Sequence, residues 1–302
     1  MPSDRLKQVF EKEVLELHAT GTAKGEENIV TEVRHAEGNR GPRFLLEGEG
    51  DKEFIRLNSN SYLGLGLHPG VIAAEESASS KFGAGPGAVR FISGSYSVHT
   101  NLEQELADFH NRQAAMIFSS AYATIISTIA ATVTKDTVVI SDELNHNCII
   151  NGTRMSSACG KVIYPHLKMD ALATSLKNWS GKARRALIVT DGVFSMRGDH
   201  APLDKIMEIA REYDHMYEEN AVVLVDDSHG VAAMGETGRG VEEFTRSTPV
   251  DILVGTLGKA FGVNGGYVTS SNAIIDFLRE KSPMYIYSNP ITTGEAAAAR
   301  KA

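Results

Sequence analysis

Lys259 stands in the segment Gly-Thr-Leu-Gly-Lys-Ala-Phe-Gly, directly after a short apolar run that predicts a buried strand. Glycines let the backbone approach a ligand closely, and a partly desolvated lysine has a lowered pKa and can form a Schiff base with a carbonyl group. Most lysines are exposed, so an isolated lysine would be interpreted as a surface residue of a loop. Lys259 is therefore a candidate for covalent chemistry only if other reactive groups lie beside it.

Asp226 and His229 follow another apolar run. A buried carboxylate needs a cationic or hydrogen-bond donor partner, which a protonated ring nitrogen of a ligand would supply, and His229 could hydrogen-bond a phenolic oxygen on the same ring. The spacing of Asp226 and His229, like that of Asp142 and His146, is also typical of metal ligands, so a metal hydrolase is the rival interpretation. A helix N-cap is the structural alternative for an aspartate after a strand, and it fits Asp227 better.

The segment Ser-Ser-Ala-Tyr-Ala at 119–123 follows a strand and opens a helix. Backbone N–H groups at a helix N-terminus, aided by the helix dipole, form a seat for a phosphate group, although serine is also a common N-cap. The sequence contains no Gly-x-Ser-x-Gly nucleophile motif, no Walker-type phosphate loop and no Gly-x-Gly-x-x-Gly that opens a strand–helix unit.

Alternating β-rich and amphipathic runs must position these residues. Several β-rich runs are continuously apolar, as expected of strands buried on both faces of a parallel sheet, and stretches such as 202–217 have helical spacing. The pattern predicts an α/β fold with a mostly parallel, doubly wound sheet and flanking helices, in which ligands bind at the carboxyl ends of the strands. The predicted strands are Ala115–Phe118, Thr137–Ser141, Lys161–Tyr164, Ala186–Thr190, Val222–Val225, Ile252–Gly255 and Gly266–Thr269.

The composition limits the partners of the chain. Lys plus Arg total 30 against 38 Asp plus Glu, which gives a formal charge of -8 and argues against a nucleic-acid surface. The two cysteines, Cys148 and Cys159, indicate no disulfide framework; we expect two buried structural thiols, with a redox pair as the alternative. Residues 1–18 predict a helix rather than a signal peptide, 21–50 predict a loose arm or small lobe, and no run reaches the length of a membrane span. We expect a cytoplasmic protein with no membrane partner.

Taken together, these residues resemble the α-oxoamine synthases, a family of fold-type I enzymes that use pyridoxal 5'-phosphate (PLP). The resemblance runs in collinear order over nearly the whole chain and comes closest to glycine C-acetyltransferase. The matching segments are 60–65, the glycine-rich 83–94 with Arg90, 141–146, 190–196, 225–230, 256–259 and 285–288.

The resemblance implies a role for each catalytic candidate. Lys259 would hold the cofactor and later shuttle the α-proton of the substrate. Asp226 would pair with the pyridinium nitrogen and keep the ring an electron sink. His229 would hydrogen-bond the phenolic oxygen, and His146 would stack on the ring.

It also implies a set of binding residues. The phosphate seat would be Ala121 and Tyr122, with Ser195 and Thr256 as further polar contacts. Ser288 and Asn289 would reach the phosphate of a neighbouring subunit, because the sites of the family lie at a homodimer interface. Asn60 and Tyr62 would lie near the substrate entrance, together with His146.

The implied activity is condensation of glycine, or another small amino acid, with acetyl-CoA or another acyl-CoA, with release of CoA. One alternative within the family is an 8-amino-7-oxononanoate synthase activity, which joins alanine to a pimeloyl thioester. A second is a catalytically impaired, PLP-binding fragment or partner subunit. The substrates would be small molecules in each enzymatic case.

The resemblance divides the chain into an N-terminal helix and arm (1–55), a large PLP-binding α/β domain (56–290), and the start of a linker helix (291–302) to a small C-terminal domain that the sequence lacks. Two residues depart from the family pattern. Ile125 and Ser61 stand where the family usually has asparagine.

Overall fold

The computed structural model describes residues 3–302, which divide into two units between Ser59 and Asn60. The first unit contains helix α1 (Asp4–Ala19) and a hairpin of two antiparallel strands, β1 (Val30–Arg34) and β2 (Arg43–Leu46). The predicted N-terminal helix is confirmed from Asp4 onward, while residues 1–2 of that prediction lie outside the described part. The expectation of a loose arm or small lobe over 21–50 did not include the hairpin, because strands this short carry little periodic signal.

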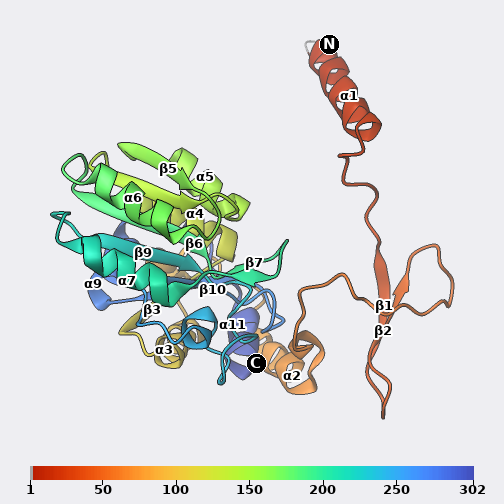
Figure 1. Cartoon of the computed structure of the whole chain (residues 1–302). Helices are drawn as coiled ribbons and strands as arrows, with labels where there is room; N and C mark the ends of the chain where they lie inside the picture. The colour runs from red at the N-terminus through yellow and green to blue at the C-terminus, as the bar shows by residue number, and fades with distance from the viewer. Residues whose placement is uncertain (1–2) are drawn as a thin grey trace. The chain divides into compact units, whose positions relative to one another are not determined.

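A seven-stranded sheet with the strand order β3-β11-β10-β9-β6-β4-β5 organises the second unit (Figure 1). Its strands are β3 (Ala114–Phe118), β4 (Thr137–Asp142), β5 (Gly160–Tyr164), β6 (Arg185–Asp191), β9 (Ala221–Asp226), β10 (Ile252–Thr256) and β11 (Gly266–Ser270). All seven predicted strands are therefore confirmed, to within one residue at each end. A small hairpin, β7 (Val193–Phe194) and β8 (Asp199–His200), follows β6.

Helices flank this sheet and confirm the predicted α/β fold class. The helices and helical turns are η1 (Leu65–Leu67), α2 (Pro69–Phe82), the π-helical turn η2 (Arg90–Gly94), α3 (Ser97–Phe109), α4 (Ala121–Thr132), α5 (Asn147–Met155), α6 (Met169–Trp179), α7 (Leu203–Asp214), α8 (Val241–Phe244), α9 (Asn272–Lys281), α10 (Pro283–Ile286) and α11 (Thr293–Lys301). Helix α11 packs on α2 and α3. The domain limits at 55/56 and 290/291 remain predictions.

The strands are apolar along their whole length because both faces of the sheet are covered. In β4, Val138 and Ile140 point into the core formed with α6 and α7, whereas Val139 points into the core formed with α4, α5 and α9. Figure 1 shows α6 and α7 on one face of the sheet. Successive side chains of a strand point to opposite faces of the sheet, and here both faces are buried. The strand is therefore apolar at every position and not only at every second one.

Strand β11 is the exception to the parallel arrangement, since it pairs antiparallel with both β10 and β3. The connection from β10 to β11 spans only residues 257–265, too short for the helical crossover that a parallel neighbour requires. The chain therefore turns back at the carboxyl end of β10, and this turn carries Lys259. The remaining neighbouring strand pairs are parallel.

An ion-pair network within the second unit holds the end of the glycine-rich segment against α3 and α9. Nη1 and Nη2 of Arg90 each donate to Glu103 of α3 at 3.0 Å, and Arg279 of α9 donates to the same carboxylate at 3.0 Å. Arg279 also donates to the hydroxyl of Tyr285 at 2.7 Å. The network thereby ties 90–94 to the segment that leads to Ser288.

We expect Ile140→Ala to lower the free energy of unfolding by about 2–5 kcal/mol, since Ile140 is fully buried in an interior strand and its loss leaves a cavity. The matched control is Ile163→Ala on edge strand β5, where the side chain is 71% exposed and the change should be within about 0.5 kcal/mol. Urea denaturation of both variants measures the effect. Equal losses would contradict the assigned core.

Candidate active site

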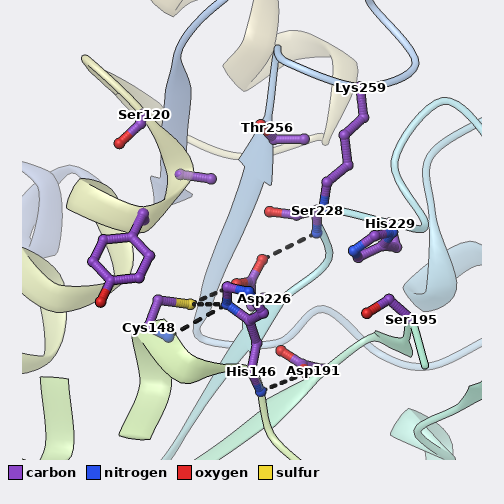
Figure 2. Close-up of a pocket in the computed structure, with 12 residues that line it drawn as sticks. Ser120, His146, Cys148, Asp191, Ser195, Asp226, Ser228, His229, Thr256 and Lys259 are labelled. Carbon is purple, nitrogen blue, oxygen red and sulfur yellow. Dashed lines mark hydrogen bonds between the residues drawn. The ribbon is translucent and has the colours of Figure 1, made fainter. Parts of the chain in front are cut away.

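A cavity of about 250 Å³ lies at the carboxyl edge of the sheet. Its lining comes from the segments that follow β3, β4, β6, β9 and β10, which is where ligands bind in open α/β sheets. Figure 2 shows these side chains converging on one space. The lining residues are Ser120, Ala121, Tyr122, His146, Cys148, Asp191, Ser195, Asp226, Ser228, His229, Thr256 and Lys259.

Asp226 and Lys259 face the same cavity. Asp226 is the last residue of β9 and is 6% exposed; its Oδ1 accepts the backbone N–H of Ser228 at 3.1 Å. The side chain of Lys259 extends from the β10–β11 turn toward Asp226 (Figure 2). Burial lowers the pKa of Lys259, and the charges of Asp226 and Asp191 only partly oppose this effect. The site therefore favours an amine that can lose its proton and act as a nucleophile or base.

The turn that carries Lys259 is fixed by its own hydrogen bonds. The hydroxyl of Thr256 donates to the carbonyl oxygen of Gly265 at 3.2 Å and accepts the N–H of Gly258 at 3.1 Å. Gly265 has a φ of 120°, which a residue with a side chain rarely adopts. Thr256 thus holds the turn as well as lining the cavity.

His229 is half-buried beside a tyrosine from the start of the second unit. The hydroxyl of Tyr62 lies 2.6 Å from His229 Nδ1 and 3.4 Å from Asn60 Oδ1. Burial, followed by the charge of Lys259, lowers the pKa of His229 to about 4, so the imidazole is neutral near pH 7. Burial raises the pKa of Tyr62, which therefore remains a hydroxyl.

His146 and Asp191 are linked through the backbone. The N–H of His146, the N-cap of α5, donates to Asp191 Oδ2 at 2.8 Å, and the N–H of Asp191 donates to Asn145 Oδ1 at 2.8 Å. Asn145 also donates to the carbonyl oxygen of Val189 at 2.8 Å. Burial, and then the charge of Asp226, raises the pKa of Asp191 to about 8. Besides Asp226, the cavity thus holds the carboxyl group of Asp191, which resists ionisation.

The far end of the cavity is the N-terminus of α4. The Ser120 hydroxyl accepts the N–H of Ala123 at 3.1 Å, so Ser120 is the N-cap. Ala121 and Tyr122 contribute the first two N–H groups of the helix, which a helix does not use internally. A side chain at Gly266 would place its Cβ 2.3 Å from the Ala121 nitrogen, so glycine is required where β11 passes this helix end. An anion fits this position.

These groups together suit an aromatic cofactor that carries a phosphate, a cationic ring nitrogen and a carbonyl carbon. The N-terminus of α4 would receive the phosphate, Asp226 the ring nitrogen and Lys259 the carbonyl carbon. The buried hydroxyl of Ser228 has no hydrogen-bond partner among the described residues, although it lines the cavity. A buried hydroxyl that lacks a partner and lines the cavity is consistent with a polar ligand that would hydrogen-bond to it.

The structure brings together most of the residues that the sequence singled out. Eight of them line the cavity: Ala121, Tyr122, His146, Ser195, Asp226, His229, Thr256 and Lys259. Tyr62 contacts His229, and Asn60 contacts Tyr62. Ser288 and Asn289 are not among the lining residues, and their contact with a second subunit remains a prediction.

Three lining residues, Cys148, Asp191 and Ser228, had no predicted site role, whereas Ser120 lies in the predicted phosphate-seat segment 119–123. Asp191 is the last residue of β6 and Ser228 stands two residues after β9, so their position at strand ends was the available signal. Cys148 lies in the first turn of α5, where only its distance of two residues from His146 pointed to the site.

Several structural expectations need correction. Asp142 does not share a site with His146; its carboxylate contacts His166 Nδ1 at 2.8 Å and accepts the N–H of Leu167 at 3.0 Å. Asp227 caps no helix directly after its strand; its Oδ2 instead accepts the N–H of Val241, the first residue of the more distant helix α8, at 2.8 Å.

The cysteines differ from each other. Cys148 is buried, as expected, but Cys159 is exposed. The segment that carries Cys159 leads into edge strand β5, where one side of the chain remains open to solvent. Among residues 3–302, no helix combines the length and the apolar run that a membrane crossing requires.

Asp191→Asn should stabilise the cofactor-free chain increasingly as the pH rises from about 4 to about 8. The pKa of Asp191 is raised to about 8 in the folded state, so the unfolded chain loses this proton first and the stability of the wild type falls through that range. The asparagine cannot ionise and keeps an acceptor for the N–H of His146. We expect a gain on the order of 2–4 kcal/mol at pH 8 and little at pH 4.

Urea denaturation at both pH values measures this difference, with the exposed Asp276→Asn as the control. A gain of equal size at both pH values would show that ionisation of Asp191 is not its cause.

Comparisons with known proteins identify the family. The model for class I and II aminotransferases matches residues 52–302. The chain is 43% identical over 258 residues to 8-amino-7-oxononanoate synthase 1 of Bacillus velezensis. That match covers 85% of this chain and 63% of that protein. It is 39% identical over 295 residues to 8-amino-7-oxononanoate synthase of Thermosipho melanesiensis, covering 97% of this chain and 71% of that protein.

Among solved structures, serine palmitoyltransferase from S. paucimobilis, a lysine-to-alanine variant with a bound PLP–myriocin aldimine, superposes with a TM-score of 0.83 at 28% identity. The match covers 99% of this chain and 70% of that one. The predicted cofactor, PLP, and the predicted fold type are thereby confirmed. The chain belongs to the class I and II aminotransferases and, within them, to the PLP-dependent α-oxoamine synthases.

Proposed function

We propose that the chain catalyses the reaction of an 8-amino-7-oxononanoate synthase, in which alanine is joined to a pimeloyl thioester. Carbon balance requires that one carbon leave as CO₂, and the thiol carrier is released. The observation that carries this proposal is the 43% identity to a synthase of that name, together with a cavity that has Lys259 and Asp226 in its lining. The relatives' names favour this activity over condensation of glycine with acetyl-CoA, which the sequence motifs had suggested.

When bound, PLP supplies a conjugated ring that stabilises negative charge on the α-carbon of an amino acid. The Asp226 carboxylate would hold a proton on the ring nitrogen, because a buried negative charge favours the cationic form of a group beside it. The backbone N–H groups of Ala121 and Tyr122 would hold the phosphate at the opposite end of the cavity.

Lys259 would act first as the nucleophile that retains the cofactor and then as the base that removes the α-proton. Both roles need the neutral amine, and burial lowers the pKa of Lys259 in that direction. The amine would later return the proton to the product. The lysine also distinguishes this chain from a silent partner subunit, because such a subunit has no need of a buried amine.

His229 would donate a hydrogen bond to the phenolic oxygen of the ring. In the tautomer whose Nδ1 accepts from the hydroxyl of Tyr62, the proton lies on Nε2 and is available as a donor. The neutral imidazole fits this role because its pKa is lowered to about 4. Asn60 and Tyr62 would then form the substrate entrance next to His229.

His146 would stack on the ring, with Ser195 as a further polar contact and Thr256 as the residue that fixes the lysine turn. We further propose a homodimer, in which Ser288 and Asn289 reach the phosphate held by a second copy.

Lys259→Ala should abolish covalent capture of PLP, because the variant lacks the amine that forms the bond. After borohydride reduction, mass spectrometry should find the pyridoxyl group on the peptide that contains Lys259 in the wild type and on no peptide in the variant. The exposed Lys161→Ala is the control and should retain the group. Capture at another lysine would overturn the assignment of Lys259.

Substrate choice can be measured from release of CoA. With alanine and pimeloyl-CoA, we expect kcat/KM to exceed that with glycine and acetyl-CoA by about 10-fold or more, because a pocket that accepts a long acyl chain gains binding energy from each methylene group. The opposite preference would identify a glycine C-acetyltransferase. Covalent PLP capture without CoA release from either pair would overturn synthase activity and favour a silent PLP-binding chain.

A further inference from the structure

Three side chains at the floor of the cavity bring an imidazole, a thiol and a carboxylate together. His146 Nδ1 lies 2.9 Å from Cys148 Sγ, and Cys148 Sγ lies 3.4 Å from Asp226 Oδ2. The three potential ligand atoms all lie within 4.8 Å of one another. Figure 2 shows the Cys148 sulfur beside the side chains of His146 and Asp226.

This set of atoms is one that Zn²⁺ prefers. Zinc binds thiolate sulfur, imidazole nitrogen and carboxylate oxygen at about 2.0–2.3 Å, so neighbouring ligand atoms of a tetrahedral site lie about 3.3–3.8 Å apart. The distance from Cys148 to Asp226 already falls in that range, and the distance from His146 to Cys148 needs to open by less than about 1 Å. Three protein ligands would leave a fourth position for water.

The backbone makes this arrangement rigid. Cys148 lies in the first turn of α5 and is 2% exposed. Its N–H donates to His146 Nδ1 at 3.3 Å, a hydrogen bond that a metal ion on Nδ1 would replace. Asp226 is fixed at the end of β9 between two parallel neighbours, β6 and β10. The ligands therefore come from two elements that the core already holds in place, which keeps the ordering cost of binding small.

One carboxylate of the cavity can attract a cation. Asp226 lines the cavity beside the amine of Lys259. In a poorly hydrated space, attraction between a divalent ion and the Asp226 carboxylate is much stronger than in water.

We infer that the cofactor-free chain binds a thiophilic divalent cation such as Zn²⁺ through His146, Cys148 and Asp226, and that the ion and PLP exclude each other. The thiol of Cys148 releases its proton to solvent when the sulfur–metal bond forms, and no electron is transferred. The mutual exclusion rests on the proposed function, in which His146 and Asp226 contact the cofactor ring. The metal binding itself does not.

Titration of the cofactor-free full-length chain with Co²⁺, a coloured substitute for Zn²⁺, tests the inference. We expect one ion per chain, a sulfur-to-cobalt charge-transfer absorption, and loss of that absorption when Zn²⁺ is added. Cys148→Ser should remove the charge-transfer absorption, whereas Cys159→Ser should retain it, since Cys159 is exposed and outside the cavity.

Asp226→Asn provides a second variant that leaves the thiol intact, and it should weaken Co²⁺ binding by at least about 10-fold. Circular dichroism of each variant verifies the fold. Absence of the absorption in the folded wild type, or its survival in Cys148→Ser with loss in Cys159→Ser, would overturn the site.

Exclusion is measured separately, by repeating the titration after PLP has been fixed on the chain with borohydride. We expect no cobalt–thiolate absorption from that form. An unchanged absorption would refute exclusion while leaving the metal site in place. Capture of PLP at Lys259 is read from mass spectra, so a failure of the proposed function would be distinguished from a failure of the metal site.

Discussion

The electrostatic problem at the centre of this molecule is a buried carboxylate, Asp226, beside a second carboxyl group, Asp191, with one amine nearby. An unpaired charge in a poorly hydrated site is costly, so the site must either neutralise its groups or bind a cation. Asp191 shows the first response, because burial and the charge of Asp226 raise its pKa to about 8. Asp226 is left as the group that a positively charged ligand atom can pair with. The binding of a cationic ring nitrogen or a metal ion depends on this difference between a neutral Asp191 and a charged Asp226.

The sheet topology determines which groups share that cavity. Strand β11 runs antiparallel between β10 and β3, and the short turn before it brings Lys259 back over the end of β9. The same reversal makes Gly266 pass the N-terminus of α4 so closely that no side chain fits. The amine and the phosphate seat are therefore positioned by one feature, the return of the chain after β10. A parallel β11 would require a long crossover and would remove both.

Much of this arrangement could be predicted from the sequence, since buried parallel strands give continuous apolar runs and the reactive residues follow those runs directly. The reversal of β11 was not predicted, although the short connection 257–265 between two predicted strands was a signal for it. Contacts between distant segments could not be predicted either. Asp142 contacts His166 and Asp227 contacts Val241, and both contacts depend on the course of the intervening chain, which residue spacing does not reveal. Cys148 was interpreted as a structural thiol because burial alone does not reveal that a side chain also faces a cavity.

One physical effect, desolvation, sets the protonation of most groups in the cavity. It lowers the pKa of His229 to about 4 and that of Lys259 below its usual value, while it raises that of Asp191. Near pH 7 the imidazole and Asp191 are therefore largely uncharged, and the amine is easily deprotonated. The Asp226 carboxylate then matches a single positive charge, such as a protonated ring nitrogen. A divalent ion needs a second negative charge, which the thiolate of Cys148 would supply. PLP and the ion would therefore both pair with the Asp226 carboxylate, but only the ion would also bind the Cys148 sulfur.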